Sequence, residues 1–313
     1  LGKPGQVVAY ITYLALLYAL NTAYLSSMSH MIQWQGQTSL NLQLHPWIPI
    51  CLLVFLFGLL LYFGLQTTAW INRIFVGLML ITFAILLSLL LQHSQLTSLQ
   101  QSAPISSNIR HILPLCLTAF GYQIIIPSLR VYLKHQTKMM TQCILIGSLI
   151  ALFLYLAWII AIQGIMPHYQ QLITLSAHHE PSKALITLLT QNLKLKIIHP
   201  ISETFSFLAI VTSFIGVSIS LFDFIKDALN NQQIKLHPVI VLCLTFGPPL
   251  LCNLTSPDLF IKALNYAGFL VAILLVIMPA MMVFQIRHKA SCPISHLLIP
   301  LVTIGCAIGI MIA

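Results

Sequence analysis

The segment from residue 112 to residue 129 contains the residues best suited to binding a small solute. Pro114 and Pro127 flank the run Phe120-Gly121-Tyr122-Gln123 in the middle of this apolar segment. A proline removes one helical hydrogen bond, and a glycine weakens the helix further. Inside a bilayer, backbone groups freed in this way are tolerated only against protein or a water-filled cavity. The pattern indicates either a broken helix that holds a substrate, as in many secondary transporters, or a helix that is only kinked for packing.

A second pattern of small or hydroxylated side chains runs along residues 205–222. These side chains recur roughly every third or fourth position, on one stripe of a helix: Thr212, Ser213, Gly216 and Ser220. Such a stripe permits close helix packing, and it is equally suited to lining a polar pathway.

Two carboxylates, Asp223 and Asp227, follow one helical turn apart. A carboxylate this close to lipid is costly unless it is paired or hydrated. The pair is therefore either an interfacial anchor with Lys226 or part of a gate or a proton-linked step.

Polar residues also lie inside the apolar segment 7–31. They are Tyr18, Asn21, Thr22 and Tyr24. An amide within a membrane span is expected to face protein and not lipid. Asn21 is therefore expected either to join two helices or to face a solute.

Other kinds of chemistry have no support in the sequence. No nucleotide-binding loop, nucleophile elbow or zinc-protease motif occurs, so we expect neither an enzyme nor a bound cofactor. His178-His179-Glu180 is the only tight histidine cluster, and without a second cluster we expect no metal site. The basic residues form no run with interleaved aromatic residues, so we expect no nucleic-acid partner.

The composition defines the class of protein that carries these residues. Only 6% of the 313 residues are charged, 58% are apolar, and the mean hydropathy is +0.95. A soluble domain has about 25% charged residues, whereas a surface in lipid needs no such covering. The seven cysteines are scattered without a C-x-x-C motif. We expect these cysteines to be buried and to act as small apolar side chains. The chain is expected to be a polytopic all-α membrane protein.

Nine apolar segments are long enough to cross about 30 Å of hydrocarbon. They cover residues 7–31, 46–64, 74–91, 112–129, 139–166, 205–222, 238–254, 263–283 and 294–313. Within the long gap 167–204, apolar residues recur at helical spacing from Pro181 to Leu193. This pattern predicts a short amphipathic helix over one face of the protein.

The basic residues predict the orientation. With residue 1 in the cytoplasm, nine of the fourteen Lys and Arg residues lie in cytoplasmic gaps. The other side has five, and three of these lie in the long gap 167–204, so the ratio over short gaps is nine to two. The positive-inside rule therefore places residue 1 in the cytoplasm and the C-terminus in the periplasm.

Several motifs occur along the chain in an order that is typical of one family. The stretch from Leu1 through Tyr18-Ala-Leu-Asn-Thr-Ala-Tyr24 resembles the third helix of the hydroxy/aromatic amino acid permease family of bacteria, and Ala119–Ser128 resembles that family's broken sixth helix. The stretch from Thr212 to Asp227 is similar to its eighth helix. Pro248-Pro249 and Tyr266-Ala-Gly268, followed by Pro279, match its ninth and tenth helices.

The resemblance implies a LeuT-type inverted-repeat transporter in which the nine segments are helices three to eleven. Residues 1–92 would be a partial first repeat, residues 111–283 a complete second repeat with an external loop at 167–204, and residues 294–313 an additional helix. Helices one and two have no counterpart, and the chain begins with Leu1. Either the sequence is a fragment, or another polypeptide supplies the pair, or the protein is degenerate.

The resemblance also implies roles for individual residues. The substrate-binding set would be Tyr18, Asn21, Thr22, Phe120, Gly121, Tyr122, Gln123, Ser213 and Phe214. The residues for ion coupling or gating would be Thr212, Ser213, Asp223 and Asp227.

The resemblance and the composition together predict a transporter of the bacterial inner membrane. It would import tyrosine, tryptophan or phenylalanine by ion-coupled symport and alternating access, with a proton, or alternatively sodium, as the coupling ion. The partners would be the amino acid, the coupling ion and the lipid bilayer. The alternative is a truncated, non-transporting membrane protein or a partner subunit of a transporter.

Overall fold

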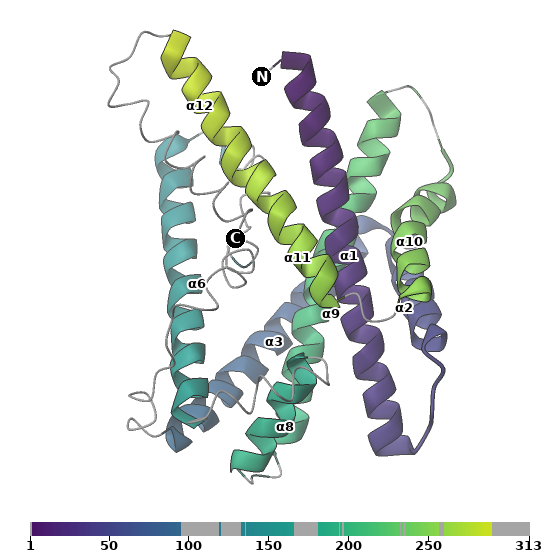
Figure 1. The fold of residues 1–313 in the computed structure, drawn as a ribbon, viewed down its shortest axis with the longest axis vertical. Coiled ribbons are helices and arrows are strands. Elements are labelled where there is room, and N and C mark those ends of the chain that lie inside the picture. The colour runs from purple at the N-terminus through teal and green to yellow at the C-terminus, as the bar shows by residue number, and fades with distance from the viewer. Residues whose placement is uncertain are drawn as a thin grey trace. The chain divides into compact units, whose positions relative to one another are not determined.

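The computed structural model describes residues 2–94, 119, 133–134, 136–165, 181–193, 195, 197–231, 233, 236–256 and 260–289. Within these residues the regular structure is helical, with no strand (Figure 1). The helices are α1 (Gly2–Leu40), α2 (Trp47–Tyr62), α3 (Leu65–His93), α6 (Thr137–Ile165), α8 (Pro181–Leu193), α9 (Ile198–Asn231), α10 (Pro238–Thr255), α11 (Phe260–Val271), the π-helix η4 (Ala272–Ile277) and α12 (Met278–Lys289).

The described residues contain six helices that are long and apolar enough to cross a membrane. Five are α1, α3, α6, α9 and α10, and the sixth runs from Phe260 to Ile286. The segment predicted at 46–64 forms α2, which has 16 residues and is a shorter apolar helix. The segments predicted at 112–129 and 294–313 lie outside the described residues, apart from the helical Ala119. The all-helical membrane class is confirmed, and the count of nine spans stays a prediction.

Two predicted helix starts are wrong. The segment expected to begin at residue 74 begins at Leu65, so Arg73 lies inside α3 and not in a gap. The segment expected at 205–222 forms the 34-residue α9, which starts at Ile198 inside the predicted long loop. Pro200 is tolerated there because amide groups in the first turn of a helix have no helical partner.

Much of the surface is apolar, as contact with lipid requires. Along the most apolar stretch of α6 no side chain is buried, and large apolar residues such as Leu145, Leu149 and Phe153 are exposed. The prediction of buried cysteines is wrong for the described ones, which are free and exposed: Cys51, Cys143, Cys243 and Cys252. A lipid-facing position favours a small apolar side chain as much as a core position does.

The chain contacts divide the protein into two compact units. One comprises residues 1–20, 104–148 and 261–313, and the other comprises residues 21–103 and 149–260. The division into repeats at 1–92 and 111–283 stays a prediction.

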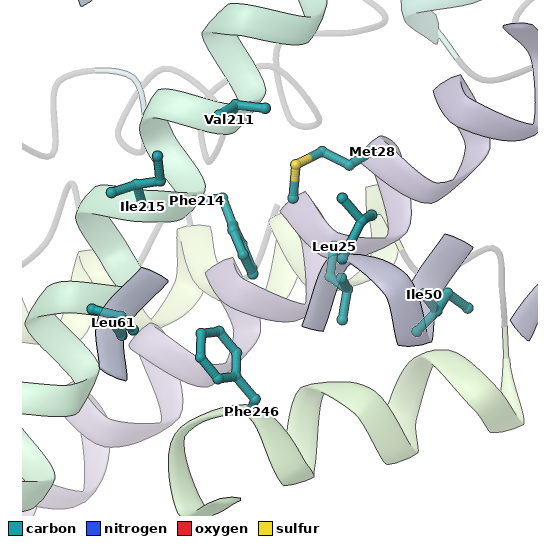
Figure 2. Close-up of a cluster of buried hydrophobic side chains, with 9 residues drawn as sticks. Leu25, Met28, Ile50, Leu61, Val211, Phe214, Ile215 and Phe246 are labelled. Carbon is teal, nitrogen blue, oxygen red and sulfur yellow. The ribbon is translucent and has the colours of Figure 1, made fainter. Parts of the chain in front are cut away.

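The second unit has a hydrophobic core to which four helices contribute. Leu25 and Met28 come from α1, and Phe246 comes from α10. The remaining fully or largely buried members are Ile50, Leu53 and Leu61 of α2 and Val211, Phe214 and Ile215 of α9. Figure 2 shows the Phe214 ring in the middle of this group. The core fixes α9 among α1, α2 and α10.

A second cluster in the same unit involves the short helix α8. Leu189 of α8 packs with Leu86 and Leu90 of α3 and with Ala161 of α6. Where α6 ends, a Cβ on Gly164 would lie 2.5 Å from the Ser94 Cβ, so only glycine permits this approach to the end of α3. The short helix predicted at 181–193 is thus confirmed as an element, with its apolar face buried.

The helix that runs from Phe260 to Lys289 widens into a π-helix just before a proline. The Met278 amide donates to the Ile273 carbonyl, five residues earlier. Pro279 has no amide hydrogen to donate, and its ring would clash with the carbonyl four residues before it. The wider turn relieves that clash without ending the helix.

The sharp turn between α2 and α3 depends on one glycine and one threonine. Gly64 has φ +117° and ψ 150°, a conformation essentially confined to glycine. The Thr68 hydroxyl donates to the Leu60 carbonyl at 2.9 Å, which pairs a carbonyl at the end of α2.

We expect Gly64→Ala to lower the free energy of unfolding by about 1–3 kcal/mol, because a Cβ is strained at this φ and ψ. The measurement is the unfolding midpoint in detergent micelles. The matched control is Gly77→Ala, in the interior of α3 with no atom within 4 Å of the new Cβ. This control should be neutral or slightly stabilising. Equal effects of the two substitutions would contradict the account of the turn.

Candidate functional site

The middle of α1 buries an unusual number of polar side chains. Within the second unit, Asn21 is fully buried. Other buried polar residues of the same helix are Thr22, Ser26, Ser27 and Ser29. In lipid these groups need partners within the protein, because the solvent offers none.

One partner comes from the middle of α9. The Ser218 hydroxyl donates a hydrogen bond of 2.9 Å to Asn21 Oδ1, and both residues are buried. The bond joins residues that are 197 positions apart in the chain. Within the described part of the protein, Asn21 Nδ2 has no hydrogen-bond partner. The Asn21 amide therefore ties α1 to α9 with its oxygen and leaves its nitrogen as a donor.

The second partner comes from α10. The fully buried Asn253 donates from Nδ2 to the Thr22 carbonyl at 3.2 Å and to the Pro249 carbonyl at 2.9 Å. Its Oδ1 has no partner among the described residues. Asn253 therefore connects α10 to α1 one residue after Asn21.

A third contact between α1 and α9 lies one turn away. The Tyr24 phenol and the Ser213 side chain form a hydrogen bond, and Tyr155 of α6 lies close to Tyr24. The Ser213 hydroxyl itself donates to the Ala209 carbonyl of its own helix at 2.9 Å. We call Asn21, Thr22, Tyr24, Ser213, Ser218 and Asn253 the buried polar cluster, in which Tyr24 and Ser213 are half-buried and the other four are buried.

The structure brings Asn21, Thr22 and Ser213 of the predicted substrate set into this cluster. Phe214, the next residue along α9, is fully buried in the hydrophobic core. Its ring meets Phe57 edge to face with centroids 4.9 Å apart. The centroid of the Phe246 ring lies 6.0 Å from that of Phe214, and Figure 2 shows the two rings near each other.

Other predicted residues lie elsewhere. Tyr18 is half-buried and belongs to the first unit. The run Phe120–Gln123 lies outside the described residues, so the broken helix predicted there stays a prediction. The cluster His178–Glu180 also lies outside, and no three His, Cys, Asp or Glu side chains gather in the described part of the chain.

The proposed coupling and gate residues lie on α9 at two levels. Thr212 donates to the Ala209 carbonyl at 3.1 Å and contacts Met79 Sδ of α3 at 3.7 Å. Near the other end, Asp223 is half-buried and Asp227 is exposed. Lys226, between them, lines a pocket of 310 Å³ formed with the start of α10. Gly216 of the small-residue stripe has open space beside it and makes no close helix approach.

The sequence matches one protein family over nearly its whole length. The model of the tryptophan/tyrosine permease family matches residues 1–309. The chain belongs to that family. The family is one of membrane transporters, so the expectation that the chain is not an enzyme is confirmed, as is the resemblance noted from its motifs.

Several relatives in this permease family match over most of the chain. Tyrosine-specific transport system 1 of Haemophilus influenzae is 31% identical over 92% of this chain and 71% of the relative. The tryptophan-specific transport protein of Shigella flexneri is 29% identical over 94% and 71%, and the low affinity tryptophan permease of Escherichia coli K12 is 28% identical over 92% and 71%. No solved structure gives a significant match. The chain is therefore a multi-pass protein of the bacterial inner membrane.

Sequence reasoning missed Ser218 and Asn253. Ser218 lies two positions from members of the small-residue stripe, and Asn253 is the only amide in the segment 238–254. An isolated amide in an apolar span is itself a signal for an interhelical partner.

We expect Ser218→Ala to lower the free energy of unfolding by about 0.6 kcal/mol, the mean for hydrogen bonds between membrane helices, and by at most about 1.7 kcal/mol. The control is Ser220→Ala, since within the described part of the chain Ser220 donates to the Gly216 carbonyl of its own helix and to no other helix. A double-mutant cycle with Asn21→Ala, followed by denaturant titration in micelles, measures the pair alone. Strictly additive effects of the two substitutions would show that the hydrogen bond contributes nothing.

Proposed function

We propose that this chain imports an aromatic amino acid, namely tyrosine, tryptophan or phenylalanine, across the inner membrane. The observation that supports this most strongly is the family match over residues 1–309, together with relatives named for tyrosine and tryptophan transport. The substrate would bind beside the midplane polar groups of α1 and α9, with Tyr18, Asn21, Thr22 and Ser213 facing it. The run Phe120-Gly121-Tyr122-Gln123 would face it from a broken helix, with Phe214 behind Ser213.

The transport cycle would be ion-coupled alternating access on a LeuT-type inverted repeat. The half-helix ends would present backbone dipoles to the zwitterion. The coupling ion would be a proton, with Thr212 and Ser213 as the position for sodium if sodium is used. Asp223 and Asp227 would belong to the cytoplasmic gate, where Asp223 is half-buried and Asp227 reaches solvent.

The buried polar cluster supports this proposal. A packed apolar bundle has no need of amides at its midplane, and burying an unpaired amide costs free energy. Asn21 Nδ2 is a buried donor on the stretch of α1 where the resemblance places substrate. It is suited to an acceptor such as a substrate carboxylate or a water molecule.

Uptake of labelled tyrosine, tryptophan and phenylalanine tests the proposal. The gene, with its native flanking sequence, is expressed in cells that lack aromatic amino acid permeases. Asn21→Leu removes the amide at similar volume and should lower uptake by at least about tenfold, which corresponds to about 1.4 kcal/mol. Gly121→Leu should also abolish uptake.

The matched control is Cys143→Ala, on an exposed face of α6, which should leave uptake unchanged. Uptake that persists without sodium and collapses with a protonophore would identify the proton as the coupling ion. No aromatic uptake above the empty vector, or full uptake by Asn21→Leu at equal expression, would refute the proposed function.

The orientation is a separate proposal, with residue 1 cytoplasmic and the C-terminus periplasmic. A reporter that is active only in the periplasm should be active when fused after Ala313, because the distribution of basic residues along the sequence predicts that topology. The control is the same reporter fused after Lys235, in a predicted cytoplasmic gap. A cytoplasmic reporter at Ala313 would show that the span count or the orientation is wrong.

A further inference from the structure

A small pocket lies between the end of α1 and the beginning of α9, within the second unit. Its volume is 150 Å³. It is lined by Met31, Trp34, Gln35, Glu203, Thr204, Phe207 and Leu208. The proposed transport site includes none of these residues.

The pocket contains a largely buried carboxylate. The Glu203 side chain is only 14% exposed, and its Oε2 lies 3.4 Å from Nδ1 of His199, one helical turn earlier on α9. A carboxylate removed from water requires a cation or several donors. His199 offers one contact and is itself partly exposed to solvent. Among the described residues that line the pocket there is no lysine or arginine, so none of them offers Glu203 a permanent positive charge.

An aromatic ring stands beside this carboxylate. Trp34 of α1 lines the pocket and packs against the His199 ring, with centroids 5.4 Å apart. Indole is the side chain that attracts an organic cation most strongly. A carboxylate adds a charge-assisted hydrogen bond to an ammonium group. The two groups together form a recognition site for a primary ammonium.

The rest of the lining favours an apolar body attached to that ammonium. Met31 and Leu208 are buried, and Phe207 is half-buried. The pocket has a volume of 150 Å³, and cavities of about this size in proteins accept benzene. The pocket therefore has room for one aromatic ring.

We propose that this pocket binds aryl-alkyl amines, with the ammonium between Glu203 and Trp34 and the ring over Met31, Phe207 and Leu208. Amines are favoured over amino acids because an amino acid brings a second carboxylate. Among the described lining residues that carboxylate finds no lysine or arginine, and Glu203 repels it. The site is thus distinct in both position and ligand charge from one that binds a zwitterion.

The test uses the full chain in detergent micelles, labelled with 5-fluorotryptophan. The chain has four tryptophans, and Trp34→Phe assigns the Trp34 fluorine resonance. Titration with 2-phenylethylamine should move the Trp34 resonance saturably. The exposed Trp47 and Trp70 report any non-saturable partition of the amine into the micelle.

Three comparisons measure how much of the binding depends on the Glu203 carboxylate and on the charge of the ligand. Glu203→Gln keeps the shape and should weaken binding by at least about tenfold, whereas Ser220→Ala, farther along α9, should not. On the unaltered chain, 2-phenylethanol and phenylalanine should each bind at least about tenfold more weakly than the amine. The last two need no variant, so they decide the matter even if Glu203→Gln does not fold.

The proposal is overturned if the Trp34 resonance shows no saturable shift with the amine. It is equally overturned if the alcohol or phenylalanine binds as tightly as the amine, or if folded Glu203→Gln binds the amine unchanged. Aromatic amino acid uptake plays no part in this readout, so the result is independent of the transport proposal.

Discussion

Hydrocarbon cannot form hydrogen bonds, and this constraint decides where the helices of the second unit touch. Apolar side chains gain little by leaving lipid for a helix interface, so packing and interhelical hydrogen bonds determine which helices associate. Asn21 is bonded by Ser218 of α9, and the next carbonyl, that of Thr22, is bonded by Asn253 of α10. Two adjacent residues of α1 are thus bonded to two different helices. The hydrophobic core then fills the space between them.

Adjacent residues of α9 make different kinds of contact, polar and apolar, because successive side chains on a helix point about 100° apart. Ser213 meets the Tyr24 phenol, while Phe214 enters the aromatic group with Phe57 and Phe246. The packing of Phe214 fixes the rotation of α9 about its axis. That rotation in turn holds the hydroxyls of Ser213 and Ser218 toward α1. The same packing of α9 therefore buries its apolar side and directs its polar side toward α1.

The sequence predicts the class and most helices well because charge depletion and long apolar runs are properties of the local chain. Helix ends were less predictable. The α3 helix begins at Leu65 because Gly64 breaks the backbone there, and the polar residues that follow do not interrupt it. The pairing of Asn21 with Ser218 spans 197 positions, and no local pattern specifies it. The sequence does not distinguish the exposed cysteines from buried ones, because positions that face lipid and positions in the core favour the same apolar residue types.

The lengths of the helices have a consequence for the membrane itself. The α3 and α6 helices each have 29 residues, which at about 1.5 Å per residue is about 43 Å. The hydrocarbon layer is about 30 Å thick, so helices of this length tilt, extend into the headgroups or thicken the bilayer around them. Since large apolar side chains cover much of α6, hydrophobic mismatch acts directly on it. The acyl-chain length of the surrounding lipid therefore becomes a variable that sets the tilt of this helix.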